Sequence, residues 1–103
     1  MESIKEIHQR AVHCAKKFHL AEAELLFVLQ QVDTHKVFRH LGYTSLFEYA
    51  TKALSLSESH AYAFITVSRK SLEVPALHAA ISEGTLSVSK AKLATVIAKE
   101  RSD

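Results

Sequence analysis

Apolar residues recur along most of the chain at spacings of three and four positions, the period of an amphipathic helix. The first such stripe comprises Ile4, Ile7, Ala11, Cys14, Ala15 and Phe18. Ser3, followed three positions later by Glu6, has the spacing of a capping box at a helix start. The pattern predicts a helix over about residues 4–18, with Cys14 as a small buried hydrophobe on its apolar side.

A second stripe predicts a helix over about residues 21–41 and comprises Leu25, Val28, Leu29 and Val32. The stripe then shifts to Val37, Phe38 and Leu41. Asp33 and Thr34 lie at the join, where Asp33 could cap a new first turn and allow a kink or restart. Gly42 has the position of a glycine that ends a helix.

Four further helices are predicted, over about residues 45–54, 58–70, 75–84 and 88–99. Ser45, Ser57 and Ser87 stand at N-cap positions, and Pro75 fits the first position of a helix, where its missing N–H costs nothing. The chain is therefore expected to be all-α, a compact bundle of about six helices. It should form one domain over residues 1–103, with residues 100–103 as a loose tail.

Composition supports this fold class. The 103 residues include two Gly and one Pro, whereas all-β folds need more turn residues. A formal charge of +2 is mildly basic and does not by itself indicate a nucleic-acid binder. The single cysteine excludes an internal disulfide. No stretch has the ~18–20 apolar residues of a membrane span, and the N-terminus lacks the apolar core of a secretion signal. The chain is expected to be cytoplasmic, without a membrane partner.

The sequence offers few candidates for a catalytic or metal-binding site. Seven histidines suggest a metal site, but His8 and His13 are five positions apart, as are His35 and His40. Five residues rotate about 140° around a helix, so neither pair converges on one ion. No nucleophile motif, glycine-rich phosphate loop or converging carboxylate pair is present. We therefore expect no enzyme activity, metal, cofactor or small-molecule substrate.

Residues 45–66 have the order of a helix-turn-helix: a short helix, a tight turn and a capped second helix. Leu56 would be the buried residue of the turn, and Ala61 and Phe64 would face inward. The outward face would carry Ser59, His60, Tyr62, Ala63 and Thr66. The residues facing the DNA groove would be Ser57, Ser59, His60, Tyr62 and Thr66, and the phosphate contacts would be Lys52, Arg69, Lys70, Lys90 and Lys92.

Two features weigh against this interpretation. Ser55 occupies a turn position where many such motifs have glycine, and the second helix begins with the acidic Glu58. A structural helical hairpin explains the same pattern, so from these residues alone both readings stay open.

A resemblance to a known protein family favours the DNA-binding interpretation. The segments Leu41-Gly-Tyr-Thr-Ser-Leu-Phe-Glu-Tyr-Ala, Leu54-Ser-Leu-Ser-Glu-Ser-His-Ala-Tyr and Glu83-Gly-Thr-Leu-Ser-Val-Ser-Lys resemble the N-terminal helical region of bacterial HNH endonuclease-like proteins. The likeness covers about residues 20–93. The spacing L-S-x-S followed by G-x-L-S also looks like the helix-turn-helix of partition-protein-B-type regulators. The resemblance implies a helical module that binds double-stranded DNA and delivers or positions something on it. In those proteins a nuclease domain follows the helical region. By this resemblance the chain is either the N-terminal piece of a longer parent protein or a stand-alone relative, and nuclease activity does not transfer to it.

The alternative is a helical protein-interaction or dimerisation domain. Its partner would dock on residues such as Leu26, Phe27 or Tyr43 if the core leaves them exposed. A homodimer is also compatible with the DNA-binding reading, because paired recognition helices read palindromic sites. The first two predicted helices are the expected self-association surface.

Overall fold

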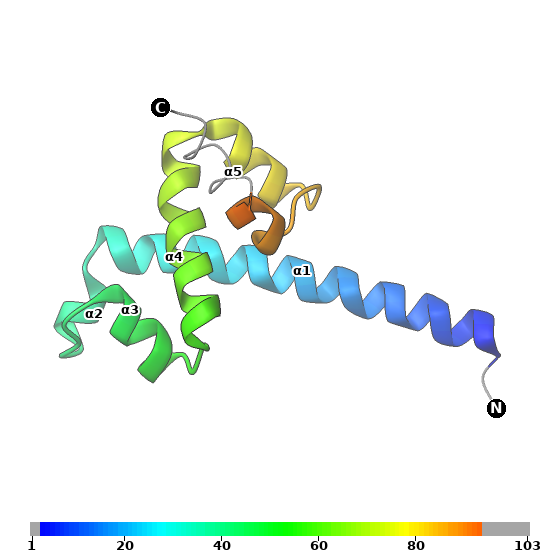
Figure 1. Cartoon of the computed structure of the whole chain (residues 1–103), viewed down its shortest axis with the longest axis horizontal. Coiled ribbons are helices and arrows are strands. Elements are labelled where there is room, and N and C mark those ends of the chain that lie inside the picture. Colours follow the sequence, from blue (N-terminus) through cyan, green and yellow to red (C-terminus); the bar gives the residue numbers. More distant parts are fainter. Residues whose placement is uncertain (1–2, 94–103) are drawn as a thin grey trace.

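The computed structural model describes residues 3–93, and every regular element in that range is helical. The expected all-α class is thus confirmed. The longest element, α1 (Ile4–Thr34), is a rod of 31 residues that the other helices surround only at its C-terminal half (Figure 1). Ser3 caps it as predicted, because the Ser3 hydroxyl accepts a hydrogen bond of 3.2 Å from the backbone N–H of Glu6.

The expected break between helices at residues 18–21 is wrong. These positions hold Phe18, His19, Leu20 and Ala21, none of which ends a helix. One imidazole nitrogen of His19 lies 3.3 Å from the Glu22 carboxylate, an i,i+3 contact that spans the expected break. One continuous helix therefore replaces the first predicted helix and most of the second.

The kink or restart predicted at Asp33 and Thr34 is present, but it lies just after these residues. Helix α1 ends at Thr34, and Lys36 takes a left-handed conformation (φ 54°) before the one-turn helix α2 (Val37–His40). Asp33 does not cap this restart, since its carboxylate contacts Lys36 and Arg69 instead. Gly42 follows with φ 89°, as the role predicted for it requires.

The next segment joins two short helices, α3 (Leu46–Glu48) and the π-helical η1 (Tyr49–Ala53). Ser45 caps α3 through the backbone N–H of Glu48, at 3.0 Å. The wider π-helical turn is closed by the N–H of Leu54, which donates to the Tyr49 carbonyl at 3.2 Å.

Helices α4 (Glu58–Glu73) and α5 (Pro75–Ser82) meet at Val74, whose extended backbone is the conformation favoured before proline. The turn at Gly84 (φ 79°) leads to a last helix over residues 88–93, which Ser87 caps. The remainder of the predicted 88–99 helix and the predicted tail lie outside the described residues.

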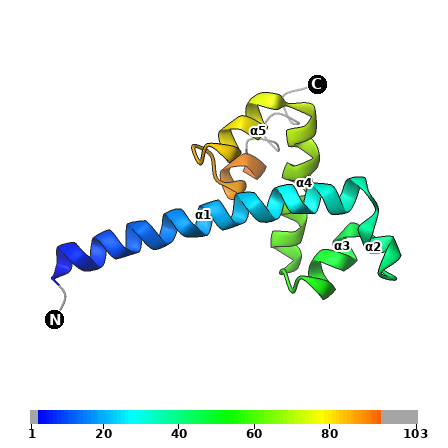
Figure 2. The ribbon, with the colours of Figure 1, turned by 180° about the vertical axis from the view of Figure 1, so that it is seen from behind.

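The core forms where α4 crosses the C-terminal half of α1 (Figure 2). Leu26, Leu29 and Val67 are essentially inaccessible to solvent. The cluster around them is completed by Val32, Phe38, Leu46, Phe64, Ile81, Val88 and Ala91. Every described element except η1 contributes a residue to this cluster, which makes residues 22–93 one packed unit, called here the helical body.

The first part of α1 packs against little. All residues from Ser3 to Ala21 are exposed, and both ribbon views show this segment projecting away from the other helices (Figures 1 and 2). We call residues 3–21 the arm. Cys14 lies on it and is exposed, so the prediction of a buried Cys14 is wrong. The apolar stripe is present, but α4 lies near it only at Phe18, which lines a pocket with His60 and Phe64.

Candidate nucleic-acid interface

Helix α4 is held in place by a capped start and by a polar contact with α1. The Ser57 hydroxyl accepts a hydrogen bond of 3.1 Å from the backbone N–H of His60, as predicted for an N-cap. The preceding turn contains Ser55 at φ 57°, so the position where many helix-turn-helix proteins have glycine does take the left-handed conformation here. Leu56 is half-buried against the core.

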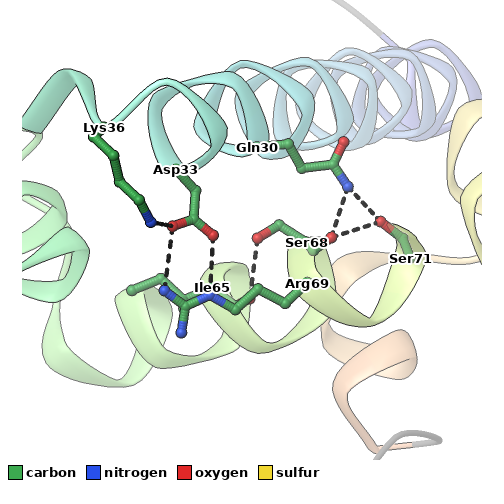
Figure 3. A network of polar contacts seen from close by, with 7 residues as sticks. All are labelled: Gln30, Asp33, Lys36, Ile65, Ser68, Arg69 and Ser71. Carbon is green, nitrogen blue, oxygen red and sulfur yellow. Dashed lines mark hydrogen bonds and ion pairs between the residues drawn. The ribbon is translucent and has the colours of Figure 1, made fainter. Parts of the chain in front are cut away.

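Farther along α4, a buried polar cluster fixes how it crosses α1 (Figure 3). The Gln30 amide donates to the Ser68 carbonyl at 2.7 Å and to the Ser71 hydroxyl, which itself donates to that carbonyl at 3.0 Å. Gln30, Ser68 and Ser71 are all buried, so the amide would lose its partners if the helices slid past one another.

Four predicted DNA-binding residues share one side of α4. Ser59, Tyr62, Thr66 and Arg69 follow one another at spacings of three, four and three positions, which align on a helix face. Ser59, Tyr62 and Arg69 are exposed, whereas Thr66 is half-buried. We call these four residues the α4 stripe.

The other groove-facing candidates lie elsewhere. Ser57 is occupied as the cap, and its hydroxyl is also 3.0 Å from the His60 ring. His60 lines a shallow, mainly apolar pocket of about 230 Å³ together with residues of α1 such as Phe18 and Leu25. Ala63, expected to point outward, is buried, since it shares a face with the buried Val67 one turn later. Fewer of the predicted groove-facing residues therefore share one exposed face of α4 than expected.

Three of the five predicted phosphate contacts already have acidic partners. Arg69 binds Asp33 through two hydrogen bonds of 3.0 and 3.3 Å, which raise the pKa of the guanidinium above its ordinary value (Figure 3). Lys70 lies 3.4 Å from the Glu73 carboxylate. Lys52 lies 3.7 Å from a carboxylate oxygen of Glu48. These cations are partly neutralised before any phosphate approaches.

Lys90 and Lys92 differ from them. Among the described residues, neither forms an ion pair with a carboxylate. Lys90 is exposed, and the Lys92 ammonium lies 5.0 Å from the centre of the Tyr62 ring. This cation–π contact places a positive charge beside the α4 stripe. Lys90 is two positions earlier and therefore about 200° away around the helix of residues 88–93, so only Lys92 is shown to lie beside the stripe.

The arm carries the excess positive charge of residues 3–93. Residues 3–21 contain four Lys or Arg and one Glu, a net charge of +3. Residues 22–93 contain seven Lys or Arg and seven Asp or Glu, so the helical body is formally neutral. Counting charge by segment, rather than over the whole chain, would have revealed this separation.

The described part of the chain gives little support for a metal site, a membrane-spanning helix or a docking site at the predicted residues. Across residues 3–93, no three His, Cys, Asp or Glu side chains gather closely enough to hold a metal ion. None of the helices in that range combines the length and apolar character needed to cross a bilayer. Leu26, predicted as a docking residue for a protein partner, is fully buried, and that prediction is wrong. Phe27 and Tyr43 are half-buried against the core.

Comparisons with protein-family models, with curated proteins and with solved structures find no match to this chain. The resemblance to the helical region of HNH endonuclease-like proteins therefore rests on the quoted residues alone.

Proposed function

We propose that this chain is a helical DNA-binding module of helix-turn-helix type, without nuclease activity of its own. The observation that carries the proposal is the α4 stripe, which follows a short helix and a left-handed turn residue and has Lys92 beside it. This is the local order in which a second helix enters the major groove. Hydroxyl groups on such a face can reach base edges or phosphates.

The charge distribution sets the expected strength of binding. A neutral helical body offers few phosphate contacts, so we expect the α4 stripe to bind DNA weakly on its own. The positive arm adds attraction that does not depend on sequence. Affinity should therefore fall steeply as salt concentration rises.

The decisive experiment is a fluorescence-anisotropy titration of a labelled mixed-sequence duplex at several salt concentrations. The test variant combines Lys90→Ala with Lys92→Ala. Loss of two phosphate contacts should weaken binding and reduce the slope of log affinity against log salt by about 1.8. These lysines are a better choice than Arg69, because Arg69→Ala would also leave Asp33 without its main partner.

The matched control is Arg39→Ala, compared with Lys92→Ala alone. Each variant removes one positive charge, and Arg39 belongs to α2, which lies on the other side of α4 from residues 88–93 (Figures 1 and 2). Lys36 is left unchanged, because it contacts Asp33, the partner of Arg69. The control should retain most of the affinity. Absence of binding at low salt, or equal losses in Lys92→Ala and Arg39→Ala, would refute the proposal.

A protein-interaction or dimerisation role is the second candidate. The observation that favours it is the exposed apolar side of the arm, where Ile4, Ile7 and Phe18 are each more than half exposed. Large apolar side chains gathered on one exposed face are typical of interaction sites. This role is compatible with DNA binding and leads to the next inference.

A further inference from the structure

The arm has the sequence pattern of a helix that packs against another helix. Its stripe follows alternating spacings of three and four through Ile4, Ile7, Ala11, Cys14, Phe18 and Ala21. These spacings are those of the a and d positions of a heptad repeat, with a at positions 4, 11 and 18 and d at positions 7, 14 and 21. All six residues are exposed in the described structure.

The arm also lacks the tertiary contacts that normally sustain a helix. Most helical stability in proteins comes from packing an apolar face against other elements. Residues 3–21 have almost no such packing, although they extend α1 by about 27 Å. A partner bound to the stripe would supply the apolar packing that the arm lacks in the single chain.

We propose that the partner is a second copy of this chain, and that the two arms form a short parallel coiled coil over residues 4–21. In this arrangement Ile4, Ile7, Ala11 and Cys14 each face their own equivalent, whereas Phe18 and Ala21 also line a pocket with His60 and Phe64 of α4. Ala11 and Cys14 lie in the middle and allow the two backbones to approach closely, while Ile4, Ile7 and Phe18 supply the larger contacts at either end.

The charges on either side of the stripe determine the direction of the pairing. Arg10 and Lys17 occupy g positions on one side, and Glu22 occupies an e position on the other side. In a parallel pair, Lys17 of one copy lies opposite Glu22 of the other, whose carboxylate is 3.3 Å from the His19 ring of its own chain. This attractive contact is formed twice. An antiparallel pair would instead bring Arg10 and Lys17 of both copies together, which is repulsive.

The middle of the stripe also favours a second helix over a membrane surface. Helices that lie on membranes bury large apolar residues along their whole length. Here Ala11, Cys14 and Ala15 would insert few apolar atoms, yet they suit close helix–helix contact. In the coiled coil, Lys5 and Lys16 remain on the outer side, where they are available to phosphates.

The test is sedimentation equilibrium of the whole chain without DNA, from micromolar to hundreds of micromolar concentrations. We expect a reversible monomer–dimer equilibrium, because fewer than three heptads form a weak interface. Ile7→Lys introduces a charge into the seam and should leave only monomer. Gln9→Lys adds the same charge on the opposite side of the arm and should dimerise nearly as wild type does.

Oxidative cross-linking tests the parallel direction. In a Cys14→Ala background, Ile7→Cys should give a covalent dimer with copper phenanthroline, whereas Gln9→Cys should give little. Circular dichroism of Ile7→Lys checks that the helical body stays folded, since Ile7 contacts none of it.

Each alternative result overturns the inference. A wild-type chain that stays monomeric at hundreds of micromolar excludes the second copy. Helicity that rises only with anionic vesicles would assign the stripe to a membrane surface. A dimer in which Ile7→Cys does not cross-link would exclude the parallel register. None of these results depends on whether the chain binds DNA.

Discussion

At the scale of single residues, two of the turns between helices depend on a residue in the left-handed backbone conformation. Ser55 and Lys36 have φ values of 57° and 54°, a region that L-residues other than Asn and Asp seldom occupy. Both lie between helices that pack on the same core, so packing of the helical body stabilises the two strained residues. The sequence shows which residue stands in such a turn but not the sign of its φ, because tertiary contacts impose it.

Ser55→Gly is therefore expected to stabilise the fold. Glycine removes a left-handed penalty of roughly 1–2 kcal/mol but increases the entropy of the unfolded chain, so the net gain should be about 0.5–1 kcal/mol. Urea denaturation followed by circular dichroism measures this gain. Gly84→Ala is the reciprocal control: an added methyl group meets no atom within 4 Å, so any loss reflects φ 79° alone. A destabilised Ser55→Gly variant would show that the turn has another conformation.

A second prediction at this scale concerns acid. The hydrogen bond from the Thr44 hydroxyl is the main cause that lowers the pKa of Glu48 in the folded state, and Lys52 adds to it. A carboxyl group whose pKa is lower when folded stabilises the fold above its unfolded pKa, and this contribution disappears as pH falls through the folded pKa. An NMR titration should place the Glu48 pKa below 4.5, and Thr44→Val should raise it. Equal values in both proteins would exclude the hydrogen bond as the cause.

At the scale of elements, helix starts were more predictable than helix lengths. The caps at Ser3, Ser45, Ser57 and Ser87 are all confirmed, because capping depends on residues three positions apart. The continuity of α1 was missed, because the join between its two stripes looked like a boundary. The pairing of Asp33 with Arg69 joins residues 36 positions apart, and no local pattern signals it.

The crossing of α1 and α4 gives the third prediction. Gln30→Glu would place a buried carboxylate against the Ser68 carbonyl without a proton to donate to it, and should cost ~2 kcal/mol or more. Gln31→Glu is the matched control, because Gln31 is exposed on the same helix. Burial raises the pKa of a carboxyl group, so the loss in Gln30→Glu should grow as pH rises above about 4.5. Similar stabilities for both variants at neutral pH would mean that Gln30 is not buried.

At the scale of the whole molecule, the core is confined to residues 22–93, although α1 runs continuously into the arm. Charge balance, apolar stripes and fold class could be read from the sequence. The sequence does not show which part of an apolar stripe is covered by other helices, because this depends on where α4 and α5 pack. The α4 stripe was predicted in part, whereas the ion pairs that neutralise its neighbouring cations were not.

Deletion of residues 1–16 should therefore leave the helical body intact. The described part of this segment, residues 3–16, forms no part of the core cluster, so the free energy of unfolding should change by less than about 0.5 kcal/mol at low protein concentration. Thermal denaturation at micromolar concentration measures this, and Leu26→Ala serves as the destabilised reference. A large loss in the truncated chain would show that the arm folds back on the body.

The separation of a positive arm from a neutral body has a consequence for movement in solution. A rod with its excess charge at one end has a large electric dipole moment along its length, even at a modest net charge. Near a polyanion such a molecule rotates before it makes contact and arrives with the arm leading. The arm would thus determine the orientation in which α4 first meets a charged surface, and added salt would randomise that orientation.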